Sequence, residues 1–79
     1  MGGWDTNAIK MYPNPSSDLI TFNRDITHLN IHDLSGKLVL KKSNVTKLKP
    51  INIADLKNGI YIVTIKNKNT SQSIKLIKQ

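Results

Sequence analysis

The chain has 79 residues and a formal net charge of +7, a length that fits one small domain and leaves no room for a second. It contains no cysteine, so neither a disulfide framework nor a thiolate metal site can support its core. No apolar run approaches the roughly 20 residues of a bilayer span, and no signal peptide is visible near the start.

The charge is unevenly placed along the chain. Residues 1–36 carry a net charge of −2, whereas residues 37–79 hold ten lysines against Asp55 alone, a net +9. This asymmetry fits a surface for anionic partners, or a solvated face whose edge lysines discourage aggregation. We favour the second, because Arg24 is the only arginine and arginine grips phosphate best. A nucleic-acid partner is therefore not expected.

The composition favours strands over helices. Ile, Val and Thr make up 20 of the 79 residues, while Glu is absent and Ala occurs twice. Residues 1–8 are interpreted as a linker or as residues added in cloning, and residues 9–79 as one domain. Short apolar stretches between turn signals predict an all-β, small antiparallel sandwich. The seven expected strands are Ile9–Tyr12, Leu19–Phe22, His28–His32, Lys37–Lys41, Ile51–Ile53, Ile60–Lys66 and Ser73–Lys78.

Alternation along the strands predicts which residues face the core. In 28–32, Leu29 and Ile31 share one face, and in 73–78, Ile74 and Leu76 do the same. The 60–66 stretch is apolar on both faces, which predicts a central strand covered on both sides. In 37–41 the core face stays ambiguous, because apolar residues occupy both faces. The aromatic residues of the strands are predicted to lie in the core, namely Tyr12, Phe22 and Tyr61.

Turn chemistry supports these divisions. Pro13 and Pro15 remove two N–H donors, so a strand cannot run straight through them. Gly36 stands where a hairpin loop needs positive φ, with Asp33 and Ser35 available to satisfy loop amides. The Asn58-Gly59 pair predicts another turn.

Residues suited to catalysis or metal binding are few. His28 and His32 are about 13 Å apart along a strand, too far to hold one ion together, and there is no cysteine to add a thiolate ligand. There is no Gly-rich phosphate loop and no Ser or Thr with an evident base. We therefore expect no metal, no cofactor and no enzymatic activity.

Four segments in this order resemble a known family. They are "MYPNPSSDLITF" (Met11–Phe22), "IHDLSGKLVLK" (Ile31–Lys41), "INIADLKNGIYIVTI" (Ile51–Ile65) and "SIKLIK" (Ser73–Lys78). Together they resemble the type A C-terminal sorting domain of the type IX secretion system of Bacteroidota. The resemblance implies an Ig-like sandwich of seven strands. It also implies a cargo protein ahead of the domain, transit through the periplasm, and passage through an outer-membrane translocon with its shuttle proteins. A sortase-type peptidase then usually removes the domain, and the cargo reaches the cell surface or is secreted.

The family's motifs match individual residues of this sequence. The residues whose role we expect to be structural are Tyr12, Pro13, Asn14, Pro15, Gly36, Lys37, Val39, Leu56, Gly59 and Tyr61. The terminal motif matches Lys75, Leu76, Ile77 and Lys78, which we expect either to be recognised by the translocon or to form only the last strand. If that strand lies at a sheet edge, its backbone could pair with a receptor strand or swap between copies into a homodimer.

Other classes of function remain open at this point. A non-catalytic binding module for carbohydrate or protein would share the sandwich, but should expose aromatic side chains in its loops. A nucleic-acid-binding domain would bind oligonucleotides with a steep salt dependence. A purely structural Ig-like spacer would tolerate loss of its last residues as far as transport is concerned.

Overall fold

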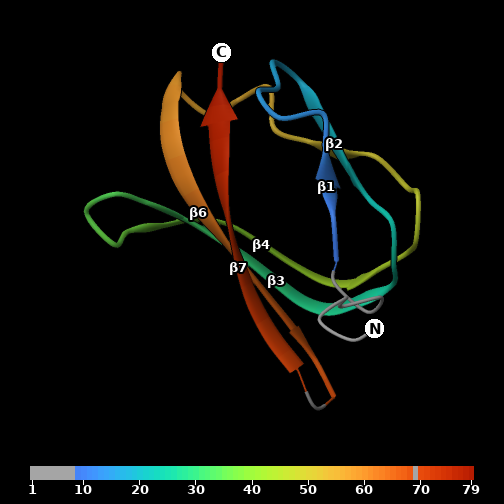
Figure 1. Ribbon diagram of the computed structural model, residues 1–79. Coiled ribbons are helices and arrows are strands. Elements are labelled where there is room, and N and C mark those ends of the chain that lie inside the picture. The colour runs from blue at the N-terminus through green and yellow to red at the C-terminus, as the bar shows by residue number, and fades with distance from the viewer. Residues whose placement is uncertain (1–8, 69) are drawn as a thin grey trace, which may run out of the picture.

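The computed structural model describes residues 9–68 and 70–79, and it shows two sheets packed face to face (Figure 1). All seven predicted strands are confirmed. The strands are β1 Met11–Tyr12, β2 Leu19–Phe22, β3 Ile26–Asp33, β4 Leu38–Val45, β5 Ile51–Asn52, β6 Gly59–Asn67 and β7 Thr70–Lys78. β3, β4, β6 and β7 are longer than expected, most clearly β4, which continues to Val45, and β7, which begins at Thr70, whereas β1 and β5 are shorter.

The strand order makes the fold an Ig-like sandwich, as predicted. The smaller sheet has the order β1-β2-β5 and the larger one β4-β3-β6-β7, with antiparallel pairing between all neighbours. In immunoglobulin lettering, strands A, B and E therefore face strands C′, C, F and G. β1 and β7 lie on one side of the sandwich, and β4 and β5 on the other.

The core lies between the two sheets. Leu29 and Ile31 of β3 are fully buried, as their alternation predicted, and they lie opposite Ile65 and Val63 of β6. The smaller sheet contributes Ile20 and other apolar residues from the facing side. The complete buried apolar set is Ile9, Met11, Ile20, Phe22, Ile26, Leu29, Ile31, Val45, Ile51, Ile53, Tyr61, Val63, Ile65 and Leu76.

We define the outer face as the side of the larger sheet that turns away from β1-β2-β5. On this face, the prediction that β6 is covered on both sides is wrong. β6 is central in its sheet, but it is covered on one face only. Ile60 is 41% exposed and Ile62 is half-buried. Apolar residues on both sides of a strand do not by themselves show which side has a partner sheet. Here the smaller sheet covers the face that carries Tyr61, Val63 and Ile65.

A bulge resolves the ambiguity in β4. The register shifts between Ile31 and His32, which lie opposite Leu40 and Leu38 respectively, so that Val39 has no direct partner. Val39 and Leu40, although adjacent, therefore both pack against the core, while Leu38 stays 46% exposed.

The prediction that three strand aromatics belong to the core is right for two of them. Phe22 and Tyr61 are buried, but Tyr12 is 43% exposed, because β1 is a two-residue edge strand whose second side chain points outward.

Tyr61 also forms a hydrogen bond that Ig-like domains use to fix the turn before strand F. Its hydroxyl donates to the backbone carbonyl of Lys57, at an O–O distance of 2.6 Å. A tyrosine near the start of strand F that bonds back to the preceding turn is the tyrosine corner of these sandwiches. The bond closes the connection from β5 to β6.

We predict that Tyr61→Phe lowers the free energy of unfolding by about 1 kcal/mol, because it removes one hydrogen bond and keeps the ring packing. Tyr12→Phe is the matched control, since the Tyr12 side chain is exposed, and its change should stay within about 0.5 kcal/mol. Urea unfolding followed by circular dichroism measures both. Equal effects of the two substitutions would contradict a structural role for the Tyr61 hydroxyl.

Candidate functional site

The closing strand β7 contributes to the core and to the surface at the same time. Leu76 is fully buried and Ile74 is packed against the core, so both point toward the smaller sheet. Lys75 is exposed and Ile77 half-buried, and these two lie on the outer face. This is the alternation that the sequence predicted.

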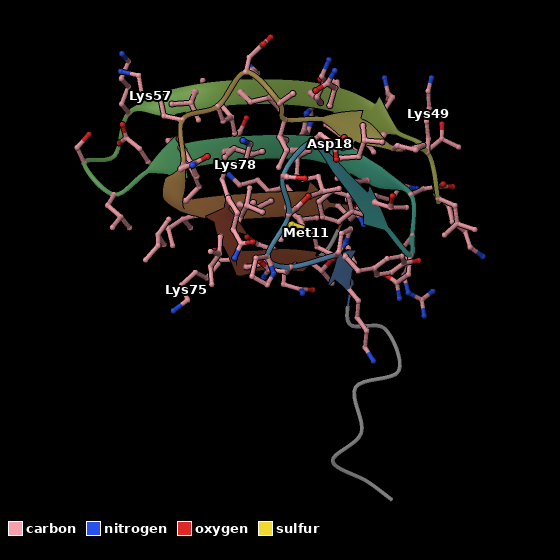
Figure 2. The ribbon with its side chains drawn as sticks, turned by 90° about the horizontal axis from the view of Figure 1, so that it is seen from above. Met11, Asp18, Lys49, Lys57, Lys75 and Lys78 are labelled. Carbon is pink, nitrogen blue, oxygen red and sulfur yellow. The ribbon has the colours of Figure 1, made fainter. Side chains whose placement is uncertain are left out.

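Lys78 is buried despite its charge, with 7% of its surface exposed. It lies opposite Gly59 in the register, on the face of β7 that carries Leu76. In Figure 2, Lys78 lies within the outline of the molecule, whereas the Lys75 side chain points away from it. No buried side-chain nitrogen in the described part of the chain lacks a hydrogen-bond partner. We infer that the aliphatic stem of Lys78 packs inside while its ammonium group reaches water.

The outer edge of β7 is held by the connection between β1 and β2. The Asn14 side chain donates from Nδ2 to the Lys75 carbonyl (2.7 Å) and accepts at Oδ1 from the Ile77 N–H (3.0 Å). Ser16 continues the contact, because its N–H donates to the Ile77 carbonyl (2.9 Å) and its carbonyl accepts from the Gln79 N–H (2.8 Å). We call these four bonds the clasp.

Local chemistry positions Asn14 and Ser16 for this contact. The peptide bonds before Pro13 and Pro15 are both cis. Because neither proline has an N–H, Asn14 and Ser16 are the residues of this stretch that can donate from the backbone. The buried Ser16 hydroxyl donates to the Leu19 carbonyl at 2.6 Å, which fixes the start of β2. Ser16 and Lys78 also form an isolated parallel bridge. Figure 1 shows the C-terminus of β7 beside this connection.

A second tie lies further along β7. The Gln72 side chain accepts from the Ile9 N–H (3.1 Å) and donates to the Ile9 carbonyl (2.6 Å). The clasp and this tie together join the two sheets along the side where β1 and β7 lie. The proline motif and the terminal motif, separate in the sequence, are thus one structural unit. The bonded residues are 61 to 63 positions apart in the sequence, and no sequence period predicts a contact over that separation.

The central glycine motif forms the β3–β4 hairpin loop as predicted. Gly36 has φ +93°, a conformation that other residues rarely adopt. The Asp33 carboxylate accepts from the Ser35 hydroxyl (2.6 Å) and from the N–H groups of Ser35 (2.9 Å) and Lys37 (3.0 Å). These bonds, with the Ser35 hydroxyl bond the largest cause, lower the pKa of Asp33 below its ordinary value.

The third motif, Leu56 to Tyr61, also has a structural explanation. Leu56 packs against the core as a half-buried residue, and Tyr61 forms the tyrosine corner. Gly59 has φ +154°, and a Cβ built there would meet nothing within 4 Å, so backbone conformation rather than space favours glycine. Gly59 lies opposite Lys78, so this motif also abuts the closing strand.

The terminal motif presents one exposed cation, Lys75, beside the half-buried Ile77. Residues 9–68 and 70–79 contain no group of three or more His, Cys, Asp or Glu side chains that could hold a metal ion. Within the same residues, no helix is long and apolar enough to cross a membrane. Of the four terminal-motif residues, only Lys75 is exposed, and Ile77 is partly so. An exposed cation beside apolar side chains can make side-chain contacts with a protein partner, whereas its backbone edge is already occupied by the clasp.

Comparison with known families agrees with this arrangement. Residues 10–79 match the model of the secretion system C-terminal sorting domain. The chain belongs to this family, whose members are type IX secretion signals of Bacteroidota and are not catalytic. The domain is thus a C-terminal sorting signal for type IX secretion, which implies interaction with that machinery and export to the cell surface or beyond. A search of curated proteins gave no match.

We predict that Asn14→Ala destabilises the domain by about 1–2 kcal/mol, because it removes two hydrogen bonds to β7. Amide exchange, measured by NMR, should accelerate more at Ile77 and Gln79 than at Leu29, because exchange at the buried Leu29 reports only the global loss of stability. Ser17→Ala is the control, since Ser17 is an exposed neighbour. Unchanged exchange at Ile77 in Asn14→Ala would show that the clasp does not hold β7.

The lowered pKa of Asp33 predicts a pH dependence. A carboxylate whose pKa is lower in the folded than in the unfolded state stabilises the fold above its unfolded pKa, and this contribution is lost as pH falls through the folded pKa. The stability difference between the wild type and Asp33→Asn should therefore be constant above about pH 5 and shrink below about pH 4. Urea unfolding from pH 2 to 7 measures it, and a difference that grows toward low pH would contradict the assignment.

Proposed function

We propose that the translocon reads the closing segment Lys75–Lys78 as a folded surface held by the clasp. The observation that carries this proposal is the division of the segment between core and surface. Leu76 and Lys78 are buried within the sandwich, while Lys75 and Ile77 lie on the outer face. A receptor would therefore contact the side chains of Lys75 and Ile77 together with Ile62 and Ile60, their register partners on β6.

The wider route is part of the same proposal. The domain follows a cargo protein, crosses the periplasm with it, and engages the outer-membrane translocon and its shuttle proteins. A sortase-type peptidase then removes the domain. Residues 1–8, which lie outside the described residues, are the linker or residues added in cloning. The cargo ends at the cell surface or in the medium, and the domain itself performs no reaction. The family match supports this route.

The alternative of a carbohydrate-binding module is less well supported. Such modules present aromatic rings to their ligands, and among the described residues Tyr12 is the only exposed aromatic. A strand-swapped homodimer stays a prediction. In it, β7 of one copy would make the same clasp bonds to Asn14 and Ser16 of the other.

We predict that Lys75→Glu reduces export of a fused reporter by about five- to tenfold, because charge reversal at an exposed recognition cation turns attraction into repulsion. The reporter carries an N-terminal export signal and residues 5–79, and its amount at the surface and in the medium is measured in a bacterium with a working type IX system. Lys66→Glu is the matched control, since Lys66 is an exposed lysine on the neighbouring strand β6.

Point substitutions are preferred to deletion of residues 75–79, because the deletion also removes Leu76 from the core. Thermal unfolding of each variant confirms that the domain is folded. Equal export of wild type, Lys75→Glu and Lys66→Glu would reject Lys75 as part of the address. Failure of the wild-type domain to export the reporter would reject the sorting role in that host.

A further inference from the structure

The two sides of the sandwich differ in how their strand edges are covered. On the side of β1 and β7, the clasp and the Gln72–Ile9 tie join the sheets. On the other side, β4 is hydrogen-bonded only to β3 within the described residues, and its outer edge runs for eight residues. β5, its counterpart in the smaller sheet, has two residues and follows Pro50. β4 is therefore the longest uncovered edge of the described fold.

The segment of the chain that forms this edge is basic, and one carboxylate lies beside its end, where Asp25 accepts from the Lys47 N–H at 2.7 Å. Residues 34–54 contain five lysines and no acidic residue. The lysines are Lys37, Lys41, Lys42, Lys47 and Lys49. All five side chains are exposed, and Figure 2 shows Lys49 on the β4 side of the molecule, opposite the side of Lys75.

A pocket of about 340 Å³ opens where this edge ends. It lies between the end of β4 and the start of β5, and its lining includes Lys42, Asn44, Lys49 and Asn52. Asn44 (φ +54°) and the nearby Leu48 (φ +64°) are the only non-glycine residues with positive φ in the described part of the chain. Such conformations cost free energy and concentrate at binding sites. The end of β4 and the loop after it thus hold two residues in costly backbone conformations, next to a pocket whose lining includes Lys42 and Lys49.

We propose that the edge of β4 and this pocket receive an extended, acidic segment of a partner protein in the secretion pathway. An uncovered edge presents alternate N–H and C=O groups that only another extended backbone can satisfy in register. The lysines select acidic side chains on that segment, and the pocket accommodates one of them between Lys42 and Lys49. A second copy of this chain is excluded as the occupant, because two β4 edges would bring like charges together.

This inference rests on the sorting function, since it gives that function a second contact surface away from Lys75. The two can fail separately. Peptide binding at β4 is measured on the isolated domain, and export is measured in cells. If the wild-type domain bound no peptide but still exported its cargo normally, the proposal for the β4 edge would be wrong and the sorting role would stand.

The experiment titrates the ¹⁵N-labelled chain with a ten-residue peptide in which Asp or Glu alternates with Val or Thr. We expect amide shifts confined to 38–52. Binding should weaken about 2- to 30-fold in the double variant Lys42→Gln/Lys49→Gln, because two exposed ion pairs are lost. The control Lys66→Gln/Lys68→Gln removes the same charge elsewhere and should bind like the wild type. A peptide N-methylated at alternate residues should bind weakly, because it cannot complete a strand ladder.

Each other outcome contradicts the proposal. Equal binding of the N-methylated peptide, or of dextran sulfate at the same sites, would show that the lysines attract any polyanion without strand pairing. Shifts centred on β7, or none at millimolar peptide, would show that the β4 edge is not a docking surface. Equal weakening by both double lysine variants would reduce the effect to net charge.

Discussion

The hydrogen bonds between Asn14, Ser16 and the end of β7 are the constraint on which the arrangement of this domain depends. They join segments more than 60 residues apart and connect the smaller sheet to the larger one. A domain of this size buries only about 60–65% of its unfolded surface, so its stability margin is narrow. At about 1 kcal/mol for each hydrogen bond, the four bonds of the clasp are large against such a margin. They also satisfy backbone groups that would otherwise form an open edge.

The same contacts explain why apolar residues continue to the last positions of the sequence. Leu76 completes the core, and Ile77 forms part of the outer face beside Ile60. The strand expected to act as an address is also needed to complete the fold. Recognition of this signal and folding of the domain are therefore linked, because a receptor that reads Lys75 and Ile77 reads them only in the assembled sheet. Because the clasp occupies the edge of β7 at residues 75–79, the longest edge left for pairing by a partner is that of β4.

Much of the fold follows from the sequence, because local signals agree with it. The seven strands, the buried Leu29 and Ile31, and the Asp33–Gly36 loop follow from alternation and turn chemistry, which act over a few residues. The errors concern tertiary placement. Alternation cannot show that the outer face of β6 lacks a covering sheet, nor that Tyr12 points outward from a two-residue edge strand. The bulge that places both Val39 and Leu40 against the core shifts the period by one residue.

The candidate site was predictable in its members but not in its assembly. The motifs identified Asn14, Gly59 and Lys78 separately. Only the three-dimensional structure shows that the connection with Asn14 lies against the strand that carries Lys78. Side-chain hydrogen bonds such as those of Asn14 and Gln72 have no sequence period, so nothing in the chain shows their partners. The difference between the covered β7 edge and the uncovered β4 edge has the same origin.

The most direct test of the clasp is an NMR measurement of couplings transmitted through hydrogen bonds in the folded domain. The account predicts a coupling between the Ser16 amide nitrogen and the Ile77 carbonyl carbon, and another between the Gln79 nitrogen and the Ser16 carbonyl carbon. Couplings across the β6–β7 ladder provide the internal reference. Absence of the two clasp couplings in a spectrum that shows the β6–β7 couplings would contradict the account, because β7 would then be held by β6 alone.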